Sequence, residues 1–139
     1  MRFCIDYRKL NSVTTNDAHP LPRIKDIFDT LSGSKFFKTL DLAMKYHQVE
    51  VLFEDRKKTT YSTPFGLFQY NVMPFGLATA PATFMRLMTM LFSGMLYFTC
   101  LAYLDDIIIF RRTFEKHLNR LDQELKRLEN ANLKLKPSK

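Results

Sequence analysis

The chain has little of what defines several classes of protein. It contains no tryptophan, and its two cysteines, Cys4 and Cys100, are too few for a disulfide scaffold and fit a reducing compartment better. Its longest mostly apolar run, residues 94–104, is well short of a membrane-spanning helix, and no basic segment followed by an apolar one begins the chain. We therefore expect neither a disulfide-rich secreted domain nor a membrane protein.

The rest of the composition is typical of a globular domain. The 139 residues are 46% apolar and 25% charged, which excludes a disordered or fibrous chain and is enough for one domain with a real core. The 13 phenylalanines and six tyrosines supply a large aromatic area to that core.

Positive charge is concentrated at the C-terminal end. Residues 1–110 hold 12 Lys and Arg against 10 Asp and Glu, whereas residues 111–139 hold nine against four, and the net charge of the chain is +7. A basic C-terminal face favours a polyanionic partner such as nucleic acid. A solvated helix with a lysine-rich tail explains the same pattern without a partner.

Local patterns predict strands interleaved with helices. Polar and apolar residues alternate over residues 2–7, which predicts a half-buried strand, and the prolines and polar residues of 11–22 predict a loop. Helices are expected at 24–31, at 79–94, whose Met and Phe side chains should pack in the core, and around an apolar stripe formed by Leu118, Leu121, Leu125 and Leu128. Strands are expected at 36–42, 49–51, 59–63, 67–72, 97–104 and 107–110. This order predicts an α+β domain with a mainly antiparallel sheet packed on helices.

Three aspartates stand out against this pattern. Asp105 and Asp106 separate two apolar runs, where they would form the tip of a β-hairpin, either as turn formers or as ligands of a cation that offsets their mutual repulsion. Asp41 lies near the end of a predicted buried strand, where a lone acid is costly unless it faces solvent. Three such hard oxygen donors suit Mg²⁺, whereas the histidines are scattered and form no soft-metal site: His19, His47 and His117.

Five ordered sequence blocks carry a family resemblance. They are the Tyr-Leu-Asp-Asp of residues 103–106, the segments 2–11 and 40–48, and the segments 72–77 and 80–84. Together they cover nearly the whole chain and resemble the reverse transcriptases of gypsy-type long-terminal-repeat retrotransposons. A Tyr-x-Asp-Asp alone would be weak support, but five blocks in order make coincidence very improbable.

The resemblance implies the fold of a right-hand polymerase, with a palm and part of the fingers. On this basis the fingers comprise residues 1–15 and 51–74, and the palm comprises 16–50 and 75–139. The thumb and ribonuclease H domains of the family are expected to lie outside this fragment.

The resemblance also implies an activity, that of an RNA-directed DNA polymerase. Such an enzyme transfers a nucleotide from a dNTP to a primer 3′-hydroxyl with two Mg²⁺ ions, for which Mn²⁺ can substitute. The implied partners are an RNA or DNA template with its primer, dNTPs and the rest of a retrotransposon polyprotein, with no membrane. The implied location is intracellular, in a cytoplasmic retroelement particle or the nucleus.

The metal-binding and primer-facing residues follow from the matching motifs. Asp41 and Asp105 would be the principal metal ligands, and Asp106 would support them. The backbone carbonyl of Leu42 would add one more oxygen. The primer terminus would face Tyr103 and Leu104.

The nucleotide-binding residues also follow from the motifs. Arg2 would bind the triphosphate, and Tyr46 would act as a steric gate under the deoxyribose. Phe75 and Gly76 would shape the pocket beside the base and sugar. Each has a structural alternative, because Arg2 fits an exposed strand, Tyr46 fits a core, and a Phe next to Gly packs well in any apolar loop.

Two positions depart from the family pattern. Lys45 replaces a glycine in a segment whose backbone should approach the triphosphate, so its side chain would either block the pocket or contact a phosphate. Arg111 replaces a small residue after the catalytic hairpin. We expect weak or no activity from the fragment by itself.

Two other functions compete with the polymerase. The first is a non-catalytic nucleic-acid-binding or scaffold domain derived from a retroelement, which Lys45 and the basic C-terminal segment favour and the three aspartates oppose. The second is an RNA-templated viral RNA polymerase, which a sugar gate at Tyr46 opposes.

Overall fold

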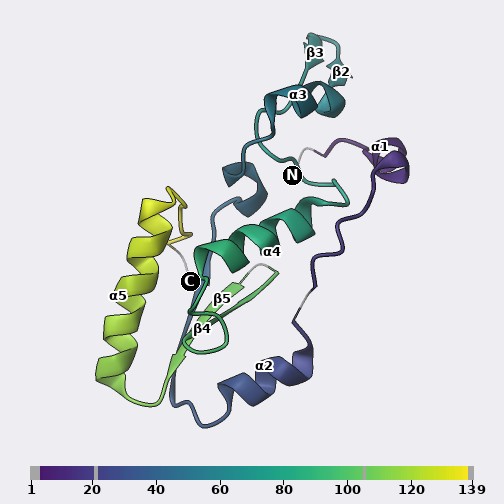
Figure 1. Ribbon diagram of the computed structural model, residues 1–139. Helices are drawn as coiled ribbons and strands as arrows, with labels where there is room; N and C mark the ends of the chain where they lie inside the picture. The colour runs from purple at the N-terminus through teal and green to yellow at the C-terminus, as the bar shows by residue number, and fades with distance from the viewer. Residues whose placement is uncertain (1–3, 21, 105, 138–139) are drawn as a thin grey trace. The chain divides into compact units, whose positions relative to one another are not determined.

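Figure 1 shows a computed structural model of the chain, which describes residues 4–20, 22–104 and 106–137. The chain forms two compact units. The first unit comprises residues 1–18 and 44–84, and the second unit comprises residues 19–43 and 85–139.

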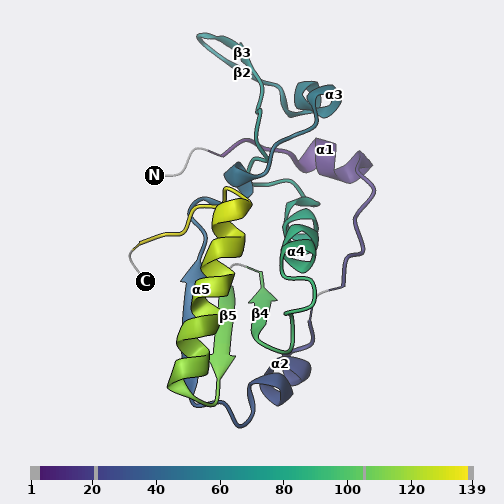
Figure 2. The same ribbon diagram turned by 60° about the vertical axis from the view of Figure 1, so that its left-hand side comes forward.

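A three-stranded antiparallel sheet is the centre of the second unit. It contains β1 (Phe36–Asp41), β4 (Cys100–Tyr103) and β5 (Asp106–Arg111) in the order β1-β5-β4. The helix α5 (Phe114–Asn130) packs against β5 and β1, and Figure 2 shows it crossing one face of the sheet. A further helix, α2 (Ile24–Leu31), precedes β1.

The core of the second unit lies between the sheet and α5. Ile107 and Ile109 of β5 are buried, and both pair with residues of β4 whose side chains share their face of the sheet. Leu128 is the buried leucine of α5. The Met- and Phe-rich segment predicted to be core packing contributes Met85, Met88 and Phe92, which are buried as expected.

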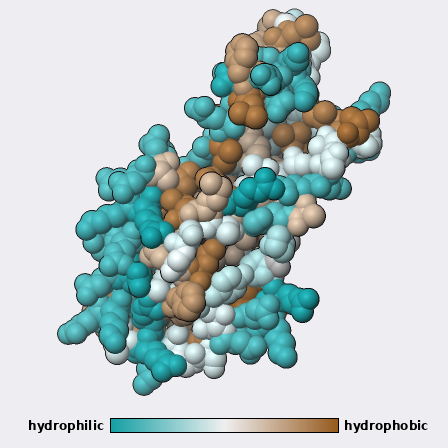
Figure 3. Space-filling view, in the orientation of Figure 1, coloured by the Kyte–Doolittle hydropathy of each residue, from teal (hydrophilic) through white to brown (hydrophobic). Residues whose placement is uncertain are grey.

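The first unit consists of short helices and one hairpin. Its elements are α1 (Arg8–Val13), η1 (Lys45–Gln48), α3 (Phe53–Arg56), η2 (Lys57–Thr59) and the hairpin β2 (Tyr61–Thr63) and β3 (Gly66–Phe68). The helix α4 (Ala80–Leu91) begins in this unit and ends in the second. Figure 3 shows apolar side chains at the surface over the hairpin and α3, where the exposed apolar residues are Leu52, Phe53, Phe65, Leu67 and Phe68.

Hydrogen bonds from α1 hold the segment around Gly76. The side-chain amide of Asn11 donates to the Gly76 carbonyl at 2.8 Å, and its oxygen accepts the backbone N–H of Ala78 at 2.9 Å. Gly76 has φ +94°, a conformation that residues with a Cβ rarely adopt. The hydroxyl of the buried Tyr7 donates to the Thr59 carbonyl at 3.1 Å, and burial raises the pKa of Tyr7 to about 12.

Most predicted elements are confirmed. The helices over 24–31, 79–94 and the C-terminal leucines, the hairpin around residues 64–66 and the strands beside Asp106 all form. The strand β5 is longer than expected, and the other strands are shorter. The mainly antiparallel α+β fold is also confirmed. None of the helices in the described ranges has the length and apolar content that crossing a membrane requires.

The strand predicted over residues 2–7 is wrong for its described part. Residues 4–7 are not in a strand. The helix α1 begins at Arg8, directly after them, and it includes the first residues of the loop predicted over 11–22. Asp6 accounts for the difference, because its carboxylate accepts the backbone N–H of Arg8 at 3.0 Å and so turns the chain. The strand predicted over 49–51 is reduced to a single bridge between Glu50 and Val72.

Two predictions of burial are also wrong. The strand β1 was expected to be buried, but Phe37, Lys38 and Thr39 are exposed because β1 lies at the edge of the sheet. Of the predicted leucine stripe of α5, Leu118 and Leu125 are largely exposed.

Candidate functional site

Two carboxylates face each other across neighbouring strands of the second unit. Asp41 at the end of β1 pairs directly with Asp106 at the start of β5, and Tyr103 of β4 pairs with Asp106 from the other side. Residues directly opposite in an antiparallel sheet have Cβ atoms about 4.5–5.5 Å apart on the same face. The three side chains therefore form a row, which we call the carboxylate row.

The carboxylate row lies on the face of the sheet away from α5. The Phe36 ring meets that of Phe114 in α5 at a centroid distance of 5.6 Å, so Phe36 and its register partner Arg111 face this helix. Side chains alternate along a strand, so Ile107 faces the helix too and Asp106 points to the other side. Both Asp41 and Asp106 are half-buried, and like charges in this arrangement repel each other.

The turn that follows the carboxylate row has an unfavourable backbone. Leu104 has φ +49°, a left-handed conformation that costs free energy for a residue with a bulky side chain. Such conformations persist only where the surrounding structure holds them, and they cluster at functional sites. Asp105, predicted to be a principal ligand, and Arg2, predicted to bind the triphosphate, both lie outside the described residues.

A lysine that the sequence did not single out lies beside Asp41. The Lys136 ammonium nitrogen is 3.9 Å from Oδ2 of Asp41, and the backbone N–H of Lys136 donates to the Asp41 carbonyl at 2.8 Å. Leu42 forms a bridge with Leu135, and the flanking hydrogen bonds use the Asp41 carbonyl and the Ala43 amide rather than the Leu42 carbonyl. The sequence indicates only a lysine-rich tail. No local pattern reveals that this tail pairs with a strand so distant in the chain.

The first unit contains a cluster of aromatic rings around Tyr46. The Tyr46 ring meets Phe75 edge-on at a centroid distance of 5.3 Å and Phe84 at 5.9 Å. Burial raises the pKa of the Tyr46 hydroxyl. Tyr46 is thus packed among other aromatic side chains, and its role as a steric gate stays a prediction.

Lys45 belongs to the same cluster. Its ammonium lies 4.5 Å from the centre of the Tyr46 ring, and only 8% of the residue is exposed. A cation over an aromatic face is attracted by the negative potential of the ring. The lysine side chain is therefore held on the ring that was predicted to be the sugar gate, and its effect on nucleotide binding stays a prediction.

The structure thus divides the predicted site residues between the two units. The second unit contains Asp41, Leu42, Tyr103, Leu104 and Asp106, and the first contains Tyr46, Phe75 and Gly76. Within the described ranges, which omit Asp105, no three His, Cys, Asp or Glu side chains form a metal-binding group. The pair Asp41 and Asp106 nevertheless supplies hard oxygen donors whose repulsion a divalent cation would offset.

Comparison with known proteins places this geometry in a family. The family model described as reverse transcriptase (RNA-dependent DNA polymerase) matches residues 1–139. The chain is 45% identical over 138 residues to the retrovirus-related Pol polyprotein from transposon 297 of Drosophila melanogaster and 38% identical to that from transposon gypsy. Each match covers 99% of this chain but only 13% of the relative's length.

A shorter relative is covered almost completely. The RNA-directed DNA polymerase homolog of Oenothera berteroana is 40% identical over 124 residues, which are 87% of each chain.

Solved structures show the same fold. The foamy viral protease-reverse transcriptase in complex with double-stranded DNA superposes with a TM-score of 0.86, covering 96% of this chain and 23% of that one at 22% identity. The foamy viral enzyme in complex with an RNA/DNA hybrid gives 0.81 over 91% of this chain and 17% of that one, also at 22% identity. The predicted resemblance and the polymerase fold are both confirmed.

Proposed function

Because the chain belongs to the reverse transcriptase family, we propose that it carries the nucleotidyl-transfer chemistry of an RNA-directed DNA polymerase within a retrotransposon Pol polyprotein. The observation that carries this proposal is the direct opposition of Asp41 and Asp106 on one face of the sheet. Two repelling carboxylates at one site have a clear use where a cation and a phosphate meet. We propose an intracellular retroelement particle or the nucleus as its location.

The donor set fits a magnesium site. We assign the metal-binding role to Asp41, Asp105 and Asp106, with the backbone carbonyl of Leu42 as a further oxygen. Two Mg²⁺ ions, or Mn²⁺ in their place, would activate the primer 3′-hydroxyl and stabilise the departing pyrophosphate. The fixed strand pairing of Asp41 with Asp106 holds two of the carboxylates in position before any ligand binds.

The substrates of this chemistry are a dNTP and a primer on an RNA or DNA template. We propose that Tyr103 and Leu104 face the primer terminus, which the position of Tyr103 in the carboxylate row supports. Attack by the primer 3′-hydroxyl on the α-phosphate releases pyrophosphate and forms the new phosphodiester bond.

For the nucleotide, we propose the roles that the motifs imply. Arg2 binds the triphosphate, Tyr46 excludes a 2′-hydroxyl, and Phe75 and Gly76 shape the space beside the base and sugar. The packing of Tyr46 against Phe75 supports the gate, because a steric gate must be held rigidly. The division into fingers (1–15 and 51–74) and palm (16–50 and 75–139) belongs to the same proposal.

A primer-extension assay tests the catalytic role. The chain would be given a primed RNA template, deoxynucleotides and Mg²⁺ or Mn²⁺, with Asp105→Asn beside it and Asp29→Asn as a control, since Asp29 is an exposed residue of α2. We expect extension by the wild type to be weak, equal in the control and absent in Asp105→Asn. Extension that survives in Asp105→Asn would contradict the assignment.

A second candidate function is nucleic-acid binding without catalysis. The contact of the Lys45 ammonium with the Tyr46 ring favours this second function. A pocket with a lysine in place of glycine has less room for a triphosphate. Lys45→Gly in the same assay separates the two functions. Rescue of extension would assign a polymerase site impaired by Lys45, whereas binding that ignores metal and nucleotide in both proteins would assign a scaffold.

A further inference from the structure

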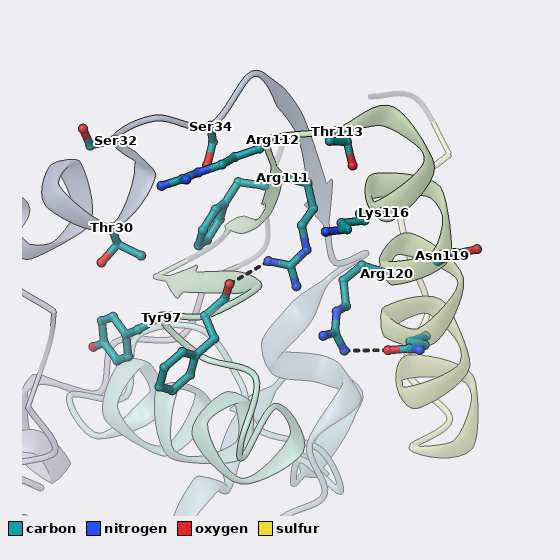
Figure 4. Close-up of a pocket in the computed structure, with 13 residues that line it drawn as sticks. Thr30, Ser32, Ser34, Tyr97, Arg111, Arg112, Thr113, Lys116, Asn119 and Arg120 are labelled. Atoms are coloured by element: carbon teal, nitrogen blue, oxygen red, sulfur yellow. Dashed lines mark hydrogen bonds between the residues drawn. The ribbon is translucent and has the colours of Figure 1, made fainter.

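A hollow of about 730 Å³ opens on the second unit, away from the carboxylate row. It lies where β5 ends and α5 begins, five residues along β5 from Asp106, which is about 17 Å. We call it the basic pocket and define it by Tyr97, Phe98, Arg111, Arg112, Lys116 and Arg120, which line it together with several polar side chains. Figure 4 shows Arg111 from β5 and Lys116 and Arg120 from α5 gathered around the same space.

The charge of the basic pocket is not balanced. Four cationic side chains line it and none of the described lining residues is acidic. Among the residues that the structure describes, Arg111, Arg112, Lys116 and Arg120 make no ion pair. Hydroxyl groups of Thr30, Ser34 and Thr113 also line the hollow, so the pocket combines positive charge with hydrogen-bond donors.

Arg111 is fixed at the inner end of the pocket. Its Nη1 donates to the Phe98 carbonyl at 2.7 Å, which holds the guanidinium in one orientation. Burial, and then the charge of Arg120, lower the pKa of Arg111 from its ordinary value. An anion in the pocket would relieve this repulsion, and a guanidinium presents two parallel donors to a phosphate.

Two exposed aromatic side chains line the same hollow. Phe98 is 75% exposed and Tyr97 is 47% exposed, whereas aromatic side chains of this size are usually mostly buried. Tyr97 also has φ +65°, a left-handed conformation that is unfavourable for an aromatic residue. The chain therefore holds a strained turn that keeps these rings at the surface beside four cations.

We propose that the basic pocket is a second nucleic-acid site that binds a single-stranded segment, with backbone phosphates on Arg111, Lys116 and Arg120 and a base stacked on Phe98 or Tyr97. Positive side chains along the backbone combined with aromatic platforms for the bases are the means by which proteins bind single strands without sequence preference. The volume lies within the range of sites that enclose a small ligand, which suits one or two nucleotides of a strand. Binding here requires no metal and no Asp41.

A matched pair of substitutions on α5 tests this site. Lys116→Gln removes a cation from the pocket, and Lys126→Gln removes the same charge from an exposed position on the same helix, where Lys126 pairs with Asp122. Binding of fluorescent oligonucleotides to the full chain would be followed by anisotropy in EDTA over a series of salt concentrations. We expect Lys116→Gln to weaken single-strand binding several-fold and to reduce the salt slope by about 0.7, whereas Lys126→Gln leaves the slope unchanged.

A third variant tests the aromatic contribution. Phe98→Ala should weaken single-strand binding about tenfold and leave the salt slope unchanged, because stacking does not release counterions. Circular dichroism checks that each variant is folded. Equal losses in Lys116→Gln and Lys126→Gln, or a loss in Phe98→Ala that is as large for duplex as for single strands, would overturn the proposal.

EDTA keeps this test independent of polymerase activity. If extension survives in Asp105→Asn but the Lys116 and Phe98 variants lose single-strand binding, the proposed catalysis is wrong and the basic pocket stands. If extension succeeds and neither variant differs from Lys126→Gln, the basic pocket is not a nucleic-acid site.

Discussion

At the scale of single residues, the strand pairing of Asp41 with Asp106 makes the carboxylate row unfavourable in the absence of a cation. Replacing Asp106 by Asn removes the repulsion between the directly opposed carboxylates. We expect Asp106→Asn to raise the free energy of unfolding by about 0.5 kcal/mol in EDTA and to abolish any further stabilisation by Mg²⁺. Thermal unfolding with and without Mg²⁺ measures both effects.

The control for this variant is Asp29→Asn, which removes the same charge from an exposed position of α2. It should keep the stabilisation by Mg²⁺. A destabilised Asp106→Asn in EDTA would show that the two carboxylates do not repel each other in the folded chain.

Lys136 gives a second prediction at this scale, because its ammonium competes with a metal ion for Asp41. The pair is partly exposed, with an N···O distance of 3.9 Å, so its own contribution to stability is below about 1 kcal/mol. Lys136→Gln should therefore change the unfolding free energy little and tighten Mg²⁺ binding a few-fold. Isothermal titration with Mg²⁺ measures this, and Lys126→Gln, which loses the same charge far from Asp41 in sequence, should bind Mg²⁺ as the wild type does.

At this scale, the sequence predicts residues whose role depends on their immediate neighbours, and it does not predict contacts between distant segments. Asp41 and Asp106 were predicted because each stands out as an acid among apolar residues. Lys136 was missed because its contact depends on the pairing of residues 134–136 with 41–43. The α1 helix was missed because one hydrogen bond from Asp6 to the backbone of Arg8 outweighs the alternation of the preceding residues.

At the scale of elements, α5 shows how a correctly predicted helix can bury an unexpected face. The leucine spacing predicted one apolar stripe, but the buried positions are His117, Glu124 and Leu128, while Leu125 is 37% exposed. The spacing of leucines gives the period of a helix, and it does not specify which side meets the sheet when polar residues on that side have partners. Glu124 has such partners, since it accepts a hydrogen bond from the Thr99 hydroxyl at 3.2 Å.

This face of α5 predicts different costs for equivalent leucines. Leu128→Ala removes a fully buried side chain and should lower the free energy of unfolding by about 3 kcal/mol. Leu125→Ala on the exposed side should cost less than about 1 kcal/mol. Urea unfolding at equal m-values measures both, and similar losses would contradict the observed burial.

The buried carboxyl of Glu124 predicts a pH dependence of stability. Burial raises its pKa above the ordinary value of 4.5, so between that value and the raised one the folded chain keeps a proton that the unfolded chain has lost. The protonated Glu124 carboxyl therefore makes its full contribution to the free energy of unfolding below pH 4.5, and this contribution is lost as the pH rises through the pKa of the folded state. Glu124→Gln should remove this loss and be more stable than the wild type at pH 7, by on the order of 1 kcal/mol.

Chemical unfolding from pH 4 to pH 8 measures the difference between the two proteins. The exposed Glu129→Gln serves as the control and should follow the wild type at every pH. A difference between Glu124→Gln and the wild type that stays constant across this range would show that Glu124 does not titrate differently in the two states.

At the scale of the whole molecule, nucleic-acid binding depends on the net charge, whereas catalysis depends on particular carboxylates. The net charge is +7, and the second unit contains both the acids of the carboxylate row and the cations of the basic pocket. Removing two negative charges raises the net charge to +9 wherever they lie, which strengthens electrostatic attraction for nucleic acid. Chemistry depends instead on which two charges are removed.

The double variant Asp41→Asn/Asp106→Asn should therefore bind a primed template at least as tightly as the wild type and lose all extension. The control Asp29→Asn/Glu129→Gln has the same net charge and should also bind more tightly, but it should retain extension because both residues are exposed and outside the carboxylate row. Anisotropy in EDTA measures binding, and single-turnover extension measures chemistry. If both double variants lost extension equally, the effect would be one of total charge, and the assignment of catalysis to the carboxylate row would fail.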